Sequence, residues 1–196
     1  MRRTIWAGAI GAALMMAAPA GAVTIDFDSL GLHVPVTNQF AEVTFSSSPG
    51  FAVIATSSAF PLGNSPPHFI CTGIIGVGAG CTEDVNVAFT NPVNNLTFHA
   101  INIRAGGIVA LIDVFDAGGL LATVNLVTDD VPFVTDLIDL SAYFNVTAIA
   151  IREVALPLGY DDFNFDISST VASPEPASMA LFGLGLLGLS AARRCR

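Results

Sequence analysis

The sequence has no lysine, and its basic residues are seven arginines. Five of them lie at the two chain ends, so residues 23–172 keep only Arg104 and Arg152 against fifteen acidic residues, a net charge of −13. Contacts with phosphates need cationic side chains. The composition therefore excludes nucleic acid as a partner. It suits divalent cations or neutral polymers, although the acidity equally serves solubility.

Common catalytic motifs are also missing. The patterns G-x-S-x-G, H-E-x-x-H and the P-loop do not occur. Without lysine there is no Schiff-base residue. The three histidines, His33, His68 and His99, are scattered along the chain. We therefore expect no catalytic residue and no enzyme. The alternative is a hydrolase that uses paired carboxylates, as glycosidases do.

The N-terminus has the three parts of a secretory signal peptide. Arg2 and Arg3 precede an apolar stretch over Ile5–Ala18, and Ala20-Gly21-Ala22 supplies small residues at the cleavage spacing. We expect signal peptidase to cut after Ala22, so that residues 1–22 leave the chain. The alternative, an uncleaved membrane helix, is disfavoured because a span usually needs about 20 apolar residues.

The C-terminus ends in a short apolar run and a basic cluster. Ala177–Ala192 carries no charge and is short for a transmembrane segment. Arg193, Arg194 and Arg196 follow it, and the positive-inside rule keeps such residues in the cytoplasm. The pattern predicts a membrane-anchored precursor whose main domain lies outside. A plain C-terminal anchor is the alternative.

A Pro-Glu-Pro motif precedes this run. Pro174 and Pro176 prevent a helix from starting there, so Pro174-Glu175-Pro176 forms an extended peptide that a protease can read. The motif, the span and the arginine cluster together resemble the PEP-CTERM sorting signal of Gram-negative bacteria over residues 173–196. The resemblance implies an inner-membrane precursor, processing by an exosortase, delivery to the cell surface or beyond, and an association with extracellular polysaccharide and biofilm. The tail would be removed, as a GPI signal is.

Two cysteines remain between these ends, Cys71 and Cys81. In an exported protein a pair this close predicts a disulfide, which would close the glycine-rich loop 72–80. A loop of this length predicts a stabilisation of about 2–3 kcal/mol.

The central region, residues 23–172, has the length of one domain and reads as all-β. Apolar and polar residues alternate in short runs between turn residues, and no amphipathic helix is evident. This pattern predicts an antiparallel two-sheet sandwich or jelly roll. The expected strands are Val23–Asp28, Val43–Phe45, Phe51–Thr56, Val85–Thr90, a run from Leu96, Gly107–Asp116, Leu120–Thr128, Val146–Val154 and Asp162–Ile167.

Three local features refine this prediction. Ala117-Gly118-Gly119 lies between two strand patterns and predicts a hairpin turn. Ile108–Val114 is apolar on both parities, which predicts a central strand covered on both faces. The apolar phase of the run from Leu96 shifts near Ala100, which predicts a β-bulge there.

The segments TIDFDSLG (24–31), VTNQFAEVTFSS (36–47) and GYDDFNFDI (159–167) resemble galactose-binding-like jelly rolls. The resemblance implies that the acidic first and last strands lie close together and hold a structural calcium. Carboxylates from separate strands suit calcium. The candidate ligands are Asp26, Asp28, Asp161 and Asp162. Alternation predicts that Asp26, Asp28 and Asp162 face away from the core, so a solvated strand face is the alternative.

These features predict an exported, non-enzymatic protein with a structural or adhesive role. The alternative is a calcium-stabilised carbohydrate-binding module. Such modules stack exposed aromatics on sugar rings. The only tryptophan, Trp6, leaves with the signal peptide, which leaves Tyr143 and Tyr160 as the candidates.

Overall fold

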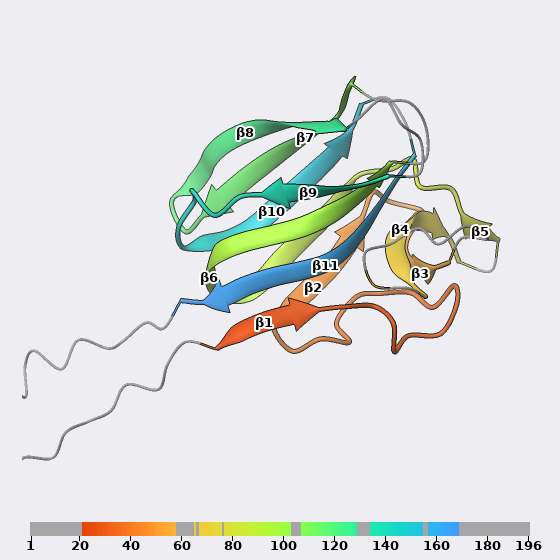
Figure 1. Cartoon of the computed structure of the whole chain (residues 1–196). Coiled ribbons are helices and arrows are strands. Elements are labelled where there is room, and N and C mark those ends of the chain that lie inside the picture. Colours follow the sequence, from red (N-terminus) through yellow and green to blue (C-terminus); the bar gives the residue numbers. More distant parts are fainter. Residues whose placement is uncertain are drawn as a thin grey trace, which may run out of the picture. The chain divides into compact units, whose positions relative to one another are not determined.

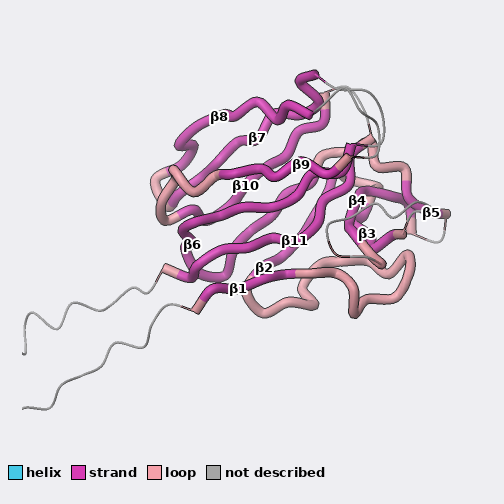
Figure 2. The backbone as a smooth tube through the Cα atoms, in the orientation of Figure 1, coloured by secondary structure: helices cyan, strands magenta, loops and turns pink. Residues whose placement is uncertain are grey.

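The computed structural model describes residues 21–57, 65, 67–75, 77–102, 107–128, 134–154 and 157–168. Every regular element in these residues is a β-strand (Figure 2). They contain no helix long and apolar enough to cross a membrane. Residues 1–20 and the tail 173–196 lie outside the described residues. These ranges contain the predicted processing residues Ala20, Pro174, Glu175, Pro176, Arg193, Arg194 and Arg196.

The described residues form eleven strands, and all of their pairings are antiparallel. They are β1 (Ala22–Ile25), β2 (Val43–Ser47), β3 (Ala52–Thr56), β4 (Phe69–Ile74), β5 (Gly78–Ala79), β6 (Val85–Asn102), β7 (Gly107–Asp116), β8 (Gly119–Thr128), β9 (Thr135–Asp139), β10 (Val146–Glu153) and β11 (Leu158–Ile167). The all-β, antiparallel prediction is confirmed. The sequence did not predict β4, β5 and β9, because their short runs are rich in glycine or interrupted by acids.

The long strand β6 belongs to both layers of the sandwich (Figure 1). Its first half pairs with β2 and β10, and β10 continues to β7 and β8. Its second half pairs with β9 and β11, and β11 continues to β1 and β4. The hydrogen-bonded ladder is therefore unbroken, while the pairing partners divide into two layers.

The inward side of β6 changes along the strand at Asn95. Val85, Val87 and Val93 are buried on one parity, and Leu96 and Phe98 are buried on the other. Asn95 has a φ of 53°, and the register with β11 shifts by one residue there. The predicted bulge near Ala100 is wrong, because the pairing with β9 and β11 is regular around that residue.

Ala100 and Ile101 are both buried because both faces of this part of the sheet are covered. Ile101 packs in a small cluster with Phe69, Cys71 and Cys81, apart from the main core. The predicted disulfide between Cys71 and Cys81 is present, with the two Cα atoms 4.9 Å apart. It links β4 to Cys81, two residues beyond β5, so the predicted glycine-rich loop is a short hairpin with a disulfide at its base.

The main core is built around aromatic rings. Phe98 from β6 stacks on Phe163 from β11 with centroids 4.9 Å apart. Phe27, just beyond β1, and Phe45 from β2 meet Phe163 edge-to-face at 6.2 and 5.5 Å. Such ring pairs add to the stabilisation from burial alone. The alternation seen in the sequence thus assigned the inward side of Ile25, Phe27, Phe163 and Phe165 correctly.

β7 and β8 form the predicted hairpin. Asp116 lies opposite Gly119, and Asp116 Oδ1 accepts a hydrogen bond from Gly118 N at 2.7 Å. The prediction that both faces of Ile108–Val114 are covered is wrong. Ile108 is 52% exposed and Leu111 is half-buried, because β7 lies next to the outermost strand and only one of its faces meets the core.

Candidate functional site

Two adjacent aspartates lie buried at an irregular point of β11. Asp161 is fully buried and Asp162 is 7% exposed. Asp161 lies opposite His99 and Asn164 opposite Thr97, so β11 has one residue more than β6 in this interval. Asp162 takes up the extra length with a φ of 46°. This bulge breaks the alternation, so the prediction that Asp162 faces away from the core is wrong.

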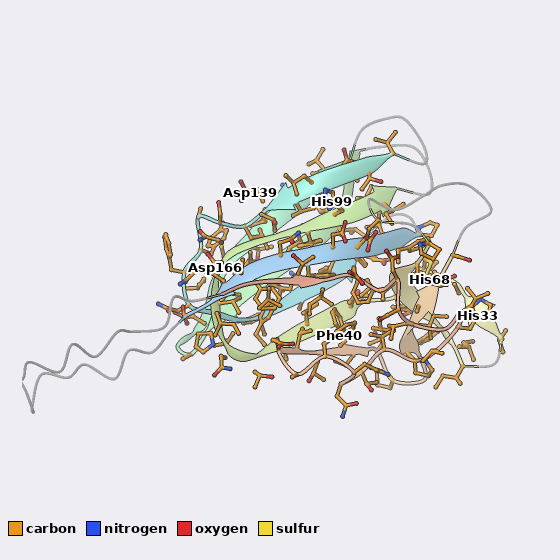
Figure 3. The ribbon with its side chains drawn as sticks, turned by 60° about the horizontal axis from the view of Figure 1, so that its bottom comes forward. His33, Phe40, His68, His99, Asp139 and Asp166 are labelled. Atoms are coloured by element: carbon orange, nitrogen blue, oxygen red, sulfur yellow. A yellow bond between two sulfur atoms is a disulfide. The ribbon has the colours of Figure 1, made fainter. Side chains whose placement is uncertain are left out.

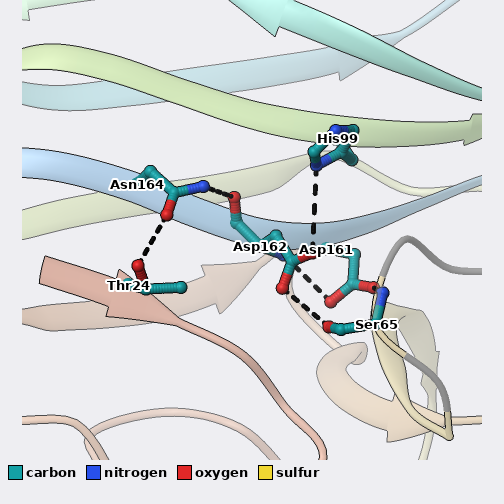
Figure 4. A network of polar contacts seen from close by, with 6 residues as sticks. All are labelled: Thr24, Ser65, His99, Asp161, Asp162 and Asn164. Carbon is teal, nitrogen blue, oxygen red and sulfur yellow. Dashed lines mark hydrogen bonds and ion pairs between the residues drawn. The ribbon is translucent and has the colours of Figure 1, made fainter.

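Hydrogen bonds hold both carboxylates in place (Figure 4). Ser65 donates from its backbone N to Asp161 Oδ2 at 3.3 Å and from its hydroxyl to Asp162 Oδ1 at 2.7 Å. The backbone N of Asp162 donates to Asp161 Oδ1 at 2.9 Å. Asn164 Nδ2 donates to the Asp162 carbonyl at 2.8 Å, and Asn164 Oδ1 accepts from the Thr24 hydroxyl at 2.6 Å. The site thus joins β1, β11 and Ser65.

The three histidines come from separate places in the fold (Figure 3). His99 on β6 has its Nδ1 atom 4.0 Å from Asp162 Oδ2. His68 precedes β4, and its backbone N donates to Asp28 Oδ1 at 3.1 Å. His33 lies in the segment beyond β1 and is exposed. Two of the three therefore touch an acidic residue of the predicted calcium site, each a different one.

The four predicted calcium ligands are only partly brought together. Asp161 and Asp162 are neighbours, and the charge of Asp28 helps to raise the pKa of Asp161. Asp26 is exposed just past the end of β1. Calcium takes six to eight oxygen ligands. Within the described residues, no three acidic, histidine or cysteine side chains form a group that could hold a metal ion. The calcium site therefore stays a prediction from sequence.

Burial changes the acid strength of Asp161. Loss of solvent raises the pKa of its carboxyl to about 7, with a further contribution from the Asp162 charge. Hydrogen bonds from the Ser65 and Asp162 backbone act in the opposite direction. Asp161 is therefore a group that changes charge near neutral pH.

Another acid with a buried carboxylate oxygen, Glu153, was not anticipated from the sequence. Tyr160 is fully buried and donates its hydroxyl to Glu153 Oε1 at 3.2 Å. Burial raises the pKa of Glu153 to about 9, and the charges of Asp84 and Glu83 add to the effect. The one signal in the sequence was that Glu153 falls within a strand pattern, seven residues before Tyr160.

The two tyrosines differ in burial. Tyr160 is fully buried and cannot stack on a sugar from solvent, whereas Tyr143 is only partly buried against the core and stays a candidate. Among the described residues, the exposed phenylalanines are Phe144 and Phe51, at 62% and 37%.

Phe51 borders a small hollow beside the disulfide hairpin. The hollow has a volume of about 210 Å³ and carries no charged side chain. Three of its lining residues are glycines, which expose the backbone of the hairpin. It is lined by Phe51, Thr72, Gly73, Ile74, Val77, Gly78, Ala79, Gly80 and Thr82.

Similarity to solved structures is low. The F5/8 type C domain of a Bacteroides fragilis protein is 12% identical, with a TM-score of 0.34 over 63% of this chain and 97% of that one. The enzymatically active domain of tailspike protein 4 from bacteriophage CBA120 is 14% identical, with a TM-score of 0.36 over 67% of this chain and 20% of that one. A Stig cyclase from Fischerella sp. TAU is 16% identical, with a TM-score of 0.33 over 77% and 87%. No curated protein sequence matches this chain.

The tail matches a known family model. Residues 174–194 correspond to the PEP-CTERM protein-sorting motif. The match includes Pro174, Glu175, Pro176, Arg193 and Arg194, and Arg196 lies just beyond it. The predicted resemblance of the tail is therefore confirmed. The chain carries a PEP-CTERM sorting motif, which implies an exported protein that is targeted to an exosortase.

Proposed function

We propose that this chain is a non-enzymatic structural or adhesive protein of the cell surface or extracellular matrix, in an exopolysaccharide or biofilm context. The observation that carries the proposal is the PEP-CTERM motif at residues 174–194, which begins six residues after the last described residue, Ser168. The sandwich would be exported behind the signal peptide, held at the inner membrane by the tail, and released or transferred by exosortase.

The buried polar groups support a structural role. Both acids at the β11 bulge accept hydrogen bonds from Ser65, and Glu153 accepts one from Tyr160. A glycosidase-type pair must instead face an open substrate site on either side of the scissile bond. Asp161 and Asp162 are enclosed by the fold, which disfavours that chemistry.

The proposal is tested by following the tail in the producing bacterium. In the parent strain we expect the chain to be shortened at its C-terminus and found outside the cell. Replacing Pro174, Glu175 and Pro176 by alanine, or deleting exosortase, should leave the full-length form in the membrane fraction. A Thr170→Ala variant, just upstream of the motif, is the matched control. Unchanged processing without exosortase would overturn the sorting step.

A second candidate function is binding of a neutral polysaccharide at the hollow beside Phe51. Its uncharged lining and the strongly acidic central region both favour a neutral ligand over an anionic one. We expect Phe51→Ala to abolish retention on a polysaccharide matrix and Phe144→Ala, at a more exposed phenylalanine, to leave retention unchanged. Equal retention of both variants would exclude the hollow as the site.

A further inference from the structure

The edge strands of the two layers differ in how well they are protected. An edge strand exposes unpaired backbone groups and can pair with another chain. β1, β2, β3 and β9 have only four or five residues each. β3 is also covered, because Val36 N donates to Val53 O at 2.7 Å and Ala55 N to Val34 O at 3.0 Å. β9 carries two aspartates, and charge discourages pairing.

β8 has none of these protections within the described residues. It has ten residues, GLLATVNLVT, without a charge or a proline. Its described backbone pairs with β7 alone, and Figure 1 shows it as the outermost strand beyond β10 and β7. At about 3.3 Å per residue, β8 offers roughly 33 Å of open edge. It is by far the longest open edge of the described sandwich.

The side chains beside this edge are apolar and exposed. Leu120 and Val127 on β8 are 59% and 56% exposed. Val127 lies opposite Ile108 of β7, which is 52% exposed. Apolar side chains at an open edge favour strand addition, because the new strand covers them while it satisfies the backbone.

We propose that β8 pairs with β8 of a second copy of this chain, antiparallel, in a twofold dimer. The layer β2–β6–β10–β7–β8 then continues from one copy into the other. The central region has a net charge of −13, so two copies repel over most of their surfaces. β8 meets β8 without a charge on either strand. A twofold contact of this kind is closed, so it gives dimers rather than fibres.

Acids lie at both ends of the strand. Asp116 precedes β8, and residues 129 and 130, which follow it, are aspartates. A dimer brings two copies of the acidic central region together, so their charges repel. Salt screens such repulsion. The dimer should therefore become tighter as salt concentration rises.

The test is the mass of the full chain in solution, in a mild detergent that keeps its apolar tail soluble. Sedimentation should show a dimer that strengthens with salt. Leu120→Glu or Val127→Glu places like charges in the contact and should weaken the dimer by about tenfold or more. Leu137→Glu on β9 is the matched control, because Leu137 is 59% exposed, the same as Leu120. This control should remain dimeric.

Hydrogen exchange gives a second measurement that does not depend on the variants folding. The amides of residues 119–128 should exchange more slowly as protein concentration rises, while those of β9 should not change. A monomer at all concentrations would overturn the proposal. So would a dimer that both β8 variants retain, since that dimer would form through another surface or through the tail. Loss of the dimer in Leu137→Glu, or its loss in high salt, would overturn it as well.

Discussion

Tyr160 donates its hydroxyl hydrogen to Glu153 Oε1 across 3.2 Å, and the tyrosine is fully buried. The other carboxylate oxygen of Glu153 is also buried, with no hydrogen-bond partner among the described residues. Burial raises the pKa of Glu153 to about 9, with a smaller contribution from the charges of Asp84 and Glu83 and against the opposing effect of the Tyr160 hydrogen bond. The glutamate is therefore held in its uncharged form at neutral pH.

This relationship predicts how stability depends on pH. The pKa of Glu153 rises from an ordinary 4.5 to about 9 on folding, so its stabilising contribution is complete below pH 4.5 and is lost as the pH rises toward 9. Glu153→Gln keeps the uncharged state at every pH. We expect the variant to gain on the order of 1 kcal/mol or more over the parent at pH 8, measured by denaturant unfolding. Asp26→Asn, at an exposed acid, should not show this gain.

The contribution of Asp161 to stability should also fall as the pH rises, but over a lower pH range than that of Glu153. Its pKa rises from an ordinary 3.8 to about 7, so its contribution is complete below pH 3.8 and falls as the pH approaches 7. Asp161→Asn loses one oxygen acceptor, which costs about 1 kcal/mol. We expect the variant to be less stable than the parent at pH 4 and to close the gap by pH 8. A gap that widens with pH would contradict the assignment.

Calcium removal tests whether the acids at the β11 bulge bind calcium or are held by hydrogen bonds without a metal. Because the described residues do not gather a metal-holding group, we expect the same melting temperature in calcium and in a chelator. A rise in calcium that is lost in Asp162→Asn would show that the sequence-based prediction of a calcium site is correct. Asp139→Asn on β9 serves as the control for a general charge effect.

The disulfide should contribute measurably to stability. Replacing both Cys71 and Cys81 by alanine should lower the free energy of unfolding by about 2–3 kcal/mol, because the unfolded chain regains the freedom of the closed loop. A reducing agent should lower the free energy of unfolding of the parent by a similar amount and leave that of the double variant unchanged. A further shift of the double variant would point to Cys195 or to another effect of the reagent.

Gly159 should tolerate no side chain. A Cβ atom at this position would lie 2.5 Å from the Phe69 ring. Gly159→Ala should therefore cost about 1–3 kcal/mol through overpacking. At Gly80 the nearest atom to an added Cβ is the Thr82 hydroxyl oxygen at 3.7 Å, so Gly80→Ala is the matched control and should unfold like the parent. Thermal unfolding of both variants checks the difference.

The sequence predicted the parts of this protein that depend on local patterns. Period-two alternation located the inward residues of the first and last strands, such as Ile25 and Phe163. The glycine pair after Asp116 located the hairpin turn. The spacing of Cys71 and Cys81 predicted the disulfide, and the Pro-Glu-Pro tail predicted the sorting motif.

Other features arise from contacts between distant segments, which no local pattern contains. Strand alternation cannot indicate a bulge that turns Asp162 inward or the hydrogen bond that Ser65 donates to it. Tyr160 is of a residue type that stacks on sugars, but it lies in the core, fully buried.

Sequence alone thus determined the fold class, the disulfide and the sorting address, because each depends on residues that are near neighbours in the chain. The tertiary structure decided which acids are buried, which tyrosine is enclosed and which strand edge is left open. Those outcomes depend on how β6 divides its pairing between two layers, and therefore on what covers each residue from another part of the chain.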